Sequence, residues 1–259
     1  MTAAPPASAP ARPEFDWKVA PIRPKRAMIL AAGMGKRMRP VTATTPKPLI
    51  EVGGRSLIDR ALDRLERAGV ERTVINVHYL AQLIRVHVNR RGTPAVVISD
   101  ETDGLLDTGG GIVKALPHLG DGPFYLLNSD SFWIEGARPN LEWLANGWRD
   151  DRMDGLLMLA STVRAVGYGG RGDFQMDPAG RLARRPEREV APFAYAGAAI
   201  LHPRLFAGRT AEPFSLNELF DEALDAGRLF GMRMDGLWLH VGTPEAIGEA
   251  EHSIADSAA

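Results

Sequence analysis

Short apolar runs alternate with amphipathic segments over the first half of the chain. Apolar runs of roughly four to eight residues between turn residues are typical of buried strands. These runs occupy residues 26–32, 72–77, 95–99 and 123–128. Apolar positions three or four apart are typical of helices. Helices are therefore expected over residues 56–68, 80–90 and 109–116. Strands and helices that alternate through short connections predict a parallel sheet.

The helix expected over residues 56–68 has signals at both ends. Ser56 is the expected N-cap, with Asp59 three positions later, and Gly69 follows the last apolar position. A serine hydroxyl at the N-cap accepts a free backbone N–H, and glycine adopts the left-handed conformation that ends many helices. The segment therefore predicts a helix with defined ends.

The second half of the chain contains more strand-like runs. They cover residues 156–160, 174–176, 182–183, 193–201 and 237–241, and helices are expected over 215–226 and 244–254. Asp177 to Gly180 reads as the turn of a hairpin. The three tryptophans at 133, 143 and 148 are expected to pack on one helix face. The predicted fold is α/β, with a Rossmann-like, mixed and mostly parallel sheet flanked by helices and an added β-rich portion.

The predicted organisation is one domain after an N-terminal tail. Residues 1–25 are rich in proline and alanine and read as a disordered or loosely docked tail, with Phe15 and Trp17 as possible anchors. Residues 26–259 then form a single domain, with halves at 26–135 and 136–259. No apolar run approaches the roughly 18–20 residues that cross a bilayer.

Composition removes several classes of chemistry. The 259 residues include no cysteine, which excludes thiol catalysis, disulfides and cysteine-ligated metals. Lys plus Arg number 31 and Asp plus Glu 32, a formal net charge of -1 that argues against a general nucleic-acid or membrane-surface binder. The absence of cysteine and of a secretory signal fits a cytoplasmic protein.

A glycine loop directly after the first expected strand carries the strongest chemical signal. Gly33 and Gly35 lie in this loop, followed by Arg37 and, within a Pro-Lys-Pro segment, Lys47. Glycines let backbone N–H groups approach phosphate oxygens, and the two cations add charge. The loop is neither Gly-x-Gly-x-x-Gly, because residue 38 is Met, nor a Walker A loop, because Arg37 stands where Ser or Thr would be. The simpler alternative is a basic surface turn.

These residues resemble the signature of nucleotidyltransferases that join a nucleoside triphosphate to a sugar 1-phosphate. The resemblance runs from about residue 26 to residue 251 and extends to the nucleotide-diphospho-sugar transferase fold, with the added β-rich portion binding the sugar. The sub-family it most resembles is the N-acetylmuramate α-1-phosphate uridylyltransferases. That resemblance rests on segments 107–112, 128–130, 170–174 and 238–243.

The resemblance implies uridylyl transfer from UTP to a sugar 1-phosphate, with pyrophosphate released and a UDP-sugar formed for peptidoglycan recycling. One alternative is a mannose-1-phosphate guanylyltransferase. An alternative of another class is a non-catalytic nucleotide-binding module. No nucleic acid or membrane partner is expected, and the sequence leaves open whether the protein is a monomer or a homo-oligomer.

The resemblance also implies roles for individual residues. Catalytic roles fall to Arg37, Lys47 and Asp130. Nucleotide-binding roles fall to Leu30, Ala32, Gly33, Met34, Gly35, Lys36, Arg37, Lys47, Asn76, Glu101 and Gly109, with Asp100 an alternative to Glu101 beside the base. Sugar-binding roles fall to Asp107, Thr108, Asn128, Gly172, Asp173 and Gly197.

Asp130 and His240 bear on the metal. Asp130 follows the fourth expected strand, at the sheet edge where α/β folds bind ligands, and a hard carboxylate suits Mg²⁺. In the resembled family Asp130 holds the metal, although a turn aspartate can also simply cap a backbone N–H. At position 240 most of the family has a second Asp, and this chain has His. Three interpretations follow. Asp130 and phosphates hold the metal while His240 binds phosphate or water, or the metal is one that tolerates histidine, such as Mn²⁺, or activity is weakened or lost.

Overall fold

The computed structural model describes residues 21–258. The expectations for Phe15, Trp17 and most of the N-terminal tail lie outside these residues. The strands are β1 (Arg26–Leu30), β2 (Glu51–Val52), β3 (Arg55–Ser56), β4 (Arg72–Val77), β5 (Ala95–Asp100), β6 (Phe124–Asn128), β7 (Ser131–Glu135), β8 (Gly155–Ser161), β9 (Phe174–Met176), β10 (Leu182–Arg184), β11 (Phe193–Leu201), β12 (Leu229–Arg233) and β13 (Gly236–His240). The helices are α1 (Leu57–Arg67), α2 (Ala81–Val88), α3 (Asp107–Leu119), α4 (Asn140–Gly147), α5 (Leu216–Asp225) and α6 (Glu245–Ala258), with short 3-10 helices at Lys36–Met38, Val41–Ala43, Lys47–Leu49 and Pro203–Phe206.

A nine-stranded sheet forms the centre of the molecule. Its main path runs β10-β9-β11-β6-β1-β4-β5. Off this path, β8 pairs with β11, and β12 pairs with β8. Strands β6, β1, β4 and β5 are parallel, whereas β11 is antiparallel to β6. The carboxyl ends of four parallel strands therefore meet at one edge, and the mixed, mostly parallel sheet is confirmed.

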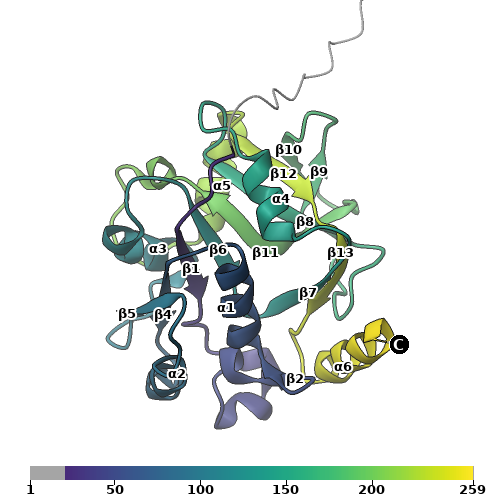
Figure 1. Cartoon of the computed structure of the whole chain (residues 1–259). Coiled ribbons are helices and arrows are strands. Elements are labelled where there is room, and N and C mark those ends of the chain that lie inside the picture. Colours follow the sequence, from purple (N-terminus) through teal and green to yellow (C-terminus); the bar gives the residue numbers. More distant parts are fainter. Residues whose placement is uncertain (1–20, 259) are drawn as a thin grey trace, which may run out of the picture.

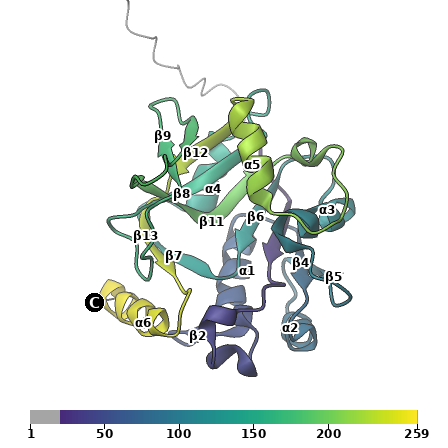
Figure 2. The ribbon, with the colours of Figure 1, turned by 180° about the vertical axis from the view of Figure 1, so that it is seen from behind.

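Helices cover both faces of this sheet (Figures 1 and 2). Alternation along β1 explains why, since Ala27 and Ile29 join one buried cluster with α1, α2 and α4, while Met28 joins another with α3 and α5. Side chains of a strand alternate between its faces, so an apolar run such as β1 needs apolar cover on both.

A small second sheet, formed partly by residues near the C-terminus, lies beside the edge of the central sheet. Strands β7 and β13 pair antiparallel, with His240 opposite Ser131. This pairing brings the end of β13 beside the turn that follows β6, and a third apolar cluster joins the two strands to α6. The pairing connects the last quarter of the chain to the edge where the parallel strands end.

Most expected elements are present, and a few were missed or misplaced. Ser56 caps α1 as expected, its hydroxyl accepting the Asp59 N–H at 3.2 Å. The expectation that the three tryptophans share a helix face was wrong, because Trp133 lies on β7, Trp143 on α4 and Trp148 just after α4. Trp133 and Trp148 are buried, and Trp143 is 37% exposed.

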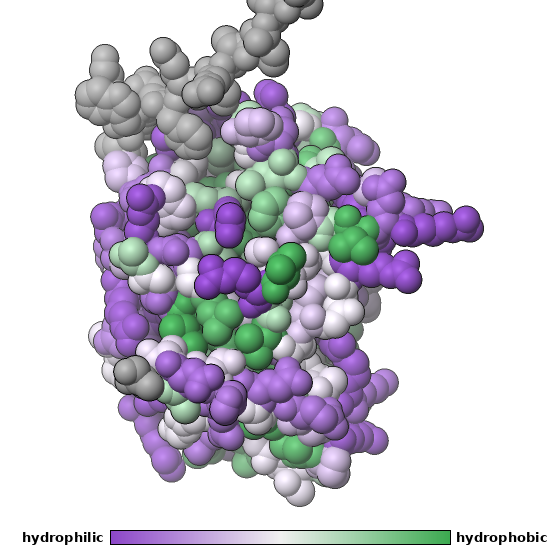
Figure 3. All heavy atoms as spheres, turned by 90° about the vertical axis from the view of Figure 1, so that its right-hand side faces the viewer, coloured by the Kyte–Doolittle hydropathy of each residue, from purple (hydrophilic) through white to green (hydrophobic). Residues whose placement is uncertain are grey.

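The surface is polar on the side where β7, β13 and α6 lie. Figure 3 shows this side covered mainly by hydrophilic residues, with hydrophobic ones gathered in small patches toward the middle. Within residues 21–258, no helix combines the length and apolar character that a membrane span requires.

Candidate active site

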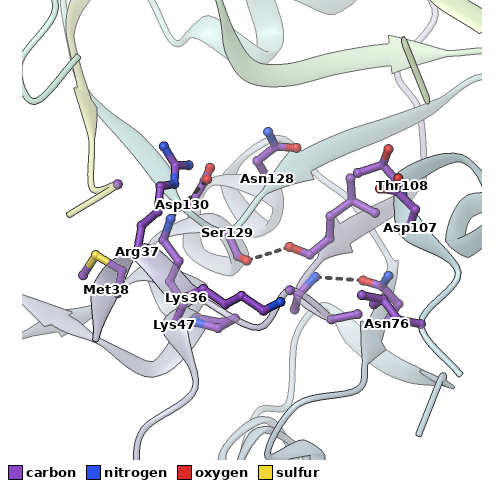
Figure 4. Close-up of a pocket in the computed structure, with 18 residues that line it drawn as sticks. Lys36, Arg37, Met38, Lys47, Asn76, Asp107, Thr108, Asn128, Ser129 and Asp130 are labelled. Atoms are coloured by element: carbon purple, nitrogen blue, oxygen red, sulfur yellow. Dashed lines mark hydrogen bonds and ion pairs between the residues drawn. The ribbon is translucent and has the colours of Figure 1, made fainter. Parts of the chain in front are cut away.

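A cavity of about 350 Å³ lies at the carboxyl edge of the parallel strands (Figure 4). The glycine loop, the ends of β4 and β6 and the start of α3 surround it. Its lining comprises Leu30, Ala31, Ala32, Gly33, Gly35, Lys36, Arg37, Met38, Lys47, Pro48, Asn76, Leu105, Asp107, Thr108, Asn128, Ser129, Asp130 and Gly242. Twelve predicted site residues are in this set: Leu30, Ala32, Gly33, Gly35, Lys36, Arg37, Lys47, Asn76, Asp107, Thr108, Asn128 and Asp130.

The glycine loop is held in shape by contacts at both ends. Gly35 adopts a left-handed conformation, with φ of 59°, and a Cβ there would fall 2.9 Å from Thr42 Cγ2. The Thr42 hydroxyl donates to the Gly35 carbonyl at 2.9 Å. At the other end, the Ala31 N–H donates to Asn76 Oδ1 at 2.8 Å. Glycine at 35 therefore meets two requirements, the positive φ and the close approach of Thr42.

Lys47 and Asp130 form an ion pair within the cavity. Lys47 Nζ lies 3.2 Å from Asp130 Oδ2, and the two side chains are 12% and 30% exposed. Pro46, Pro48 and the short helix Lys47–Leu49 fix the backbone that carries the lysine. Partial burial strengthens charge interactions. The pair therefore presents a localised cation and a carboxylate where the strands end.

The turn after β6 is tied to β1 and to β11. The Ser129 hydroxyl donates to the Leu30 carbonyl at 2.6 Å. Gly197 lies at an irregularity in β11, with φ of 77°, and a Cβ there would fall 3.1 Å from Asn128 Cβ. Glycine thus lets β11 approach the cavity residue Asn128 closely. The second half of the chain, which is expected to bind the sugar, meets the first half at this contact.

His240 sits in an aromatic group beside the cavity. Its ring centroid lies 5.6 Å from that of Trp238 and 6.2 Å from that of Tyr168. Burial lowers the pKa of His240, the charge of Asp130 opposes this, and Lys47 and Arg37 lower it further. The imidazole is therefore mainly neutral at pH 7. Gly242, two residues on, lines the cavity in its place.

The donors near Asp130 fit a divalent metal that arrives with a polyphosphate. Across residues 21–258, no group of three or more His, Cys, Asp or Glu side chains is placed to hold a metal by itself. Mg²⁺ commonly uses one or two carboxylates and takes its other ligands from phosphates and water. Asp130 can supply that carboxylate, and the neutral His240 adds a nitrogen that suits Mg²⁺ poorly.

Several predicted site residues lie outside the cavity lining: Met34, Glu101, Gly109, Gly172, Asp173, Gly197 and His240. Glu101 is 1% exposed and bonds only to other parts of the chain. The Phe214 ring covers Gly109, where a Cβ would fall 2.2 Å from Phe214 Cε2. Asp173 accepts the Tyr195 N–H at 2.8 Å, and Gly172 has φ of 78°. Asp100, the alternative to Glu101, pairs with Arg85.

Six lining residues were not predicted: Ala31, Met38, Pro48, Leu105, Ser129 and Gly242. All except Leu105 lie inside motifs that the sequence displays, close to residues for which the resemblance implied a role. Leu105 has no such signal, since an apolar residue before a helix normally indicates packing.

Comparisons with known proteins identify the family of the chain. The nucleotidyl transferase family profile matches residues 26–257. The chain is 44% identical over 238 residues to the N-acetylmuramate alpha-1-phosphate uridylyltransferase of Caulobacter vibrioides, covering 90% of this chain and 98% of that relative. It is 34% identical over 243 residues to the protein of the same name from Neisseria meningitidis serogroup B, covering 87% and 96%. It is 28% identical to a mannose-1-phosphate guanylyltransferase catalytic subunit beta from Danio rerio, covering 85% of this chain and 62% of that one.

Solved structures show the same fold. A UDP-glucose pyrophosphorylase complexed with UDP-glucose matches with a TM-score of 0.71 at 17% identity, covering 90% of this chain and 99% of that one. An inositol-1-phosphate CTP transferase from T. maritima matches with a TM-score of 0.70 at 19% identity, covering 90% and 98%. The family profile matches residues 26–257, and the Caulobacter relative is 44% identical over 90% of this chain. The chain therefore belongs to the nucleotidyl transferase family.

Proposed function

We propose that this protein transfers a uridylyl group from UTP to N-acetylmuramate α-1-phosphate, forming a UDP-sugar and pyrophosphate for peptidoglycan recycling. Two relatives that it matches over nearly their whole length bear the corresponding name. The observation that carries the proposal is the Lys47–Asp130 pair beside the glycine loop, inside one cavity. The proposal places the reaction in the cytoplasm, where nucleoside triphosphates are made.

The reaction needs charge neutralisation more than proton transfer. An oxygen of the sugar phosphate attacks the α-phosphorus of UTP, a new P–O bond forms, and the bond to the β-phosphate oxygen breaks. The attacking oxygen is already negatively charged, so no side chain has to remove a proton from it. Catalysis then depends on in-line placement and on cations at the phosphates.

The residues of the cavity divide this work. The backbone of the glycine loop and Arg37 would bind the β- and γ-phosphates, because glycines let N–H groups approach and a guanidinium forms two parallel bonds. Lys47 would neutralise the α-phosphate and the sugar phosphate. Mg²⁺, when bound with UTP, supplies further positive charge at the α-phosphate and the leaving pyrophosphate. Asp130 would hold the metal, and Mn²⁺ is an alternative because of His240.

Pyrophosphate release tests the proposal directly. Each of four nucleoside triphosphates is combined with the 1-phosphates of N-acetylmuramate, N-acetylglucosamine and mannose, first with Mg²⁺ and then with Mn²⁺. We expect turnover with UTP and N-acetylmuramate 1-phosphate. Turnover only with GTP and mannose 1-phosphate would assign the guanylyltransferase alternative. Triphosphate binding without pyrophosphate release under any condition would assign the non-catalytic alternative, which the replacement of Asp by His at 240 favours.

A further inference from the structure

Buried hydrogen bonds connect two walls of the cavity from behind. The Ala31 N–H donates to Asn76 Oδ1 at 2.8 Å, as Figure 4 shows beside Asn76. Asn76 Nδ2 donates to Glu101 Oε1 at 2.8 Å. Glu101 Oε2 accepts the Leu106 N–H at 3.1 Å. We call these three bonds the Asn76–Glu101 relay. Asn76 is 2% exposed and Glu101 is 1% exposed, so the relay is shielded from solvent.

The two ends of the relay belong to opposite walls. Ala31 begins the glycine loop after β1, where phosphates would bind. Leu106 directly precedes Asp107 and Thr108, which open α3 and line the cavity on another side. The relay therefore sets the spacing between the phosphate-binding backbone and the start of α3.

A carboxylate suits the middle of this relay for a chemical reason. Both partners of the Glu101 side chain, Asn76 Nδ2 and the Leu106 N–H, are donors. Both oxygens of a carboxylate accept, whereas an amide in the same place offers one accepting oxygen and one donating NH2 group. Within residues 21–258 no Lys, Arg or His lies within ion-pair distance of Glu101. Burying a carboxylate without a cation is costly, so a residue serving only to fill space would be neutral.

Helix α3 is packed directly against the relay. A Cβ at Gly111 would fall 2.7 Å from Glu101 Oε1 and 2.9 Å from Asn76 Nδ2. The glycine at 111 therefore leaves room for the relay to pass. Substitution at this position would push either the helix or the relay aside.

The same first turns of α3 also touch the sugar-binding half of the chain. A Cβ at Gly110 would fall 2.0 Å from the Glu212 carbonyl oxygen. The Thr108 hydroxyl accepts the Leu216 N–H at 2.9 Å, and the Gly109 N–H donates to the Phe214 carbonyl at 2.9 Å. The start of α3 is thus held between the relay and the segment that leads into α5.

We propose that Glu101 is a positioning residue that holds the glycine loop and the start of α3 in register for binding of the nucleoside triphosphate. This inference rests on the proposed function and assigns Glu101 a role without substrate contact. Because α3 also contacts residues 212–216, a shift of the relay alters binding of the sugar phosphate as well.

Reversing the polarity of the relay provides the test. In Glu101→Gln the new amide turns an N–H toward a donor, so one bond of the relay is lost. Loss of a hydrogen bond to a charged group shifts an equilibrium by roughly one to two orders of magnitude, and here that equilibrium lies between the ordered and the displaced positions of the two walls. We expect the KM for UTP to rise about tenfold or more with a smaller change in kcat. In Asn76→Asp combined with Glu101→Gln, the new carboxylate accepts from Ala31 and from the new amide, whose oxygen accepts from Leu106. We expect the double variant to recover UTP binding to within a few-fold.

Tyr125→Phe is the matched control. It removes a buried bond of 3.0 Å from the Tyr125 hydroxyl to the Leu141 carbonyl, outside the cavity lining. We expect it to lower Tm without changing the KM for UTP. Two results would overturn the role of Glu101: a lowered Tm in Glu101→Gln with an unchanged KM, or a double variant no better than the single one.

Wild-type protein separates this test from the proposed function. Calorimetric titration with UTP and the other triphosphates runs beside the kinetics. If another triphosphate binds, the proposed uridylyl transfer is contradicted, and the three variants are compared with that triphosphate. If none binds to wild-type protein, the proposed function and the role of Glu101 are both contradicted.

Discussion

At the scale of single residues, Lys47 is the side chain to which the proposed function gives the most direct role in turnover. Its ammonium group lies 3.2 Å from Asp130, and its side chain is only 12% exposed. We expect Lys47→Met to lower kcat by about a hundredfold or more, because charge stabilisation of a transition state is lost while the side-chain volume is kept. Pyrophosphate release measures the loss, and circular dichroism checks the fold. Lys25→Met, which removes an exposed lysine paired with Glu71, serves as the control and should leave kcat unchanged. A Lys47→Met variant with wild-type kcat would contradict the assignment.

His240 determines how much negative charge the metal would meet. With a neutral imidazole there, Asp130 is the carboxylate proposed to hold the metal, and His240 adds no negative charge beside it. We expect His240→Asp to lower the Mg²⁺ concentration that gives half-maximal pyrophosphate release about tenfold, which corresponds to about 1.4 kcal/mol. The control is His240→Asn, because asparagine has nearly the volume of aspartate without its charge. A difference between the two variants then reports the charge and not the loss of the aromatic stack. Equal Mg²⁺ dependence in the two variants would show that position 240 does not affect the metal.

Sequence reasoning succeeded at residues whose chemistry is visible locally. Arg37 and Lys47 follow a glycine loop, and Asp130 ends a strand, so their positions at the sheet edge follow from the order of elements. Glu101 was harder to interpret. Its partner Asn76 is 25 positions away, and no pattern in the sequence tells whether a carboxylate after a strand faces a ligand or a buried amide.

At the scale of elements, one ionic cluster joins three segments outside the active site. Asp154, just before β8, accepts bonds from Arg204 at 2.6 Å and from Arg228 at 2.9 Å. Burial alone raises the pKa of Asp154, but the bonds and charges of Arg228 and Arg204 outweigh it and leave the pKa below its usual value. The cluster therefore fixes the start of β8 to the segments before α5 and β12.

The sign of its pH dependence follows. A carboxylate with a lowered pKa in the folded state stabilises the fold above its unfolded pKa of about 3.9, and this contribution is lost as pH falls through the folded pKa. We expect Asp154→Asn to lower the free energy of unfolding by about 1–3 kcal/mol at about pH 7. The difference from wild type should be smaller at about pH 3. Urea unfolding at both pH values measures this, with the exposed neighbour substitution Asp151→Asn as control. If the difference in free energy of unfolding between Asp154→Asn and wild type is larger at the lower pH, this role of Asp154 is contradicted.

Two of the strands that the sequence did not reveal have partners far along the chain. Strand β12 includes Gly231 and pairs with β8, more than 70 positions earlier. Strand β7 directly follows a turn and pairs with β13, about a hundred positions later. Hydrophobic periodicity reports the two faces of a segment, not its neighbours. Short strands that depend on distant pairing therefore read as loops.

At the scale of the whole molecule, substrate should stabilise the protein. UTP with Mg²⁺ would contact the glycine loop, β6 and the start of α3 together, and a ligand that binds only the folded state adds about 2.7 kcal/mol at a hundred times its Kd. For a chain of this size we expect Tm to rise by roughly 5–10 °C. Thermal denaturation with and without ligand measures the rise. UMP, which lacks the β- and γ-phosphates, is the matched control and should give a smaller shift.

The central sheet crosses from one half of the chain to the other without interruption. Strand β6 pairs with β11 from Ala198 opposite Leu127 to Leu201 opposite Phe124, so a hinge rotation between the halves would break backbone hydrogen bonds. Segments outside the strands, such as residues 162–173, can change without breaking these hydrogen bonds. For protein engineering, the sheet is the part of the molecule to leave unchanged, and such loop segments are the parts to exchange. Acceptor preference should therefore be transferable between relatives by loop exchange, without redesign of the core.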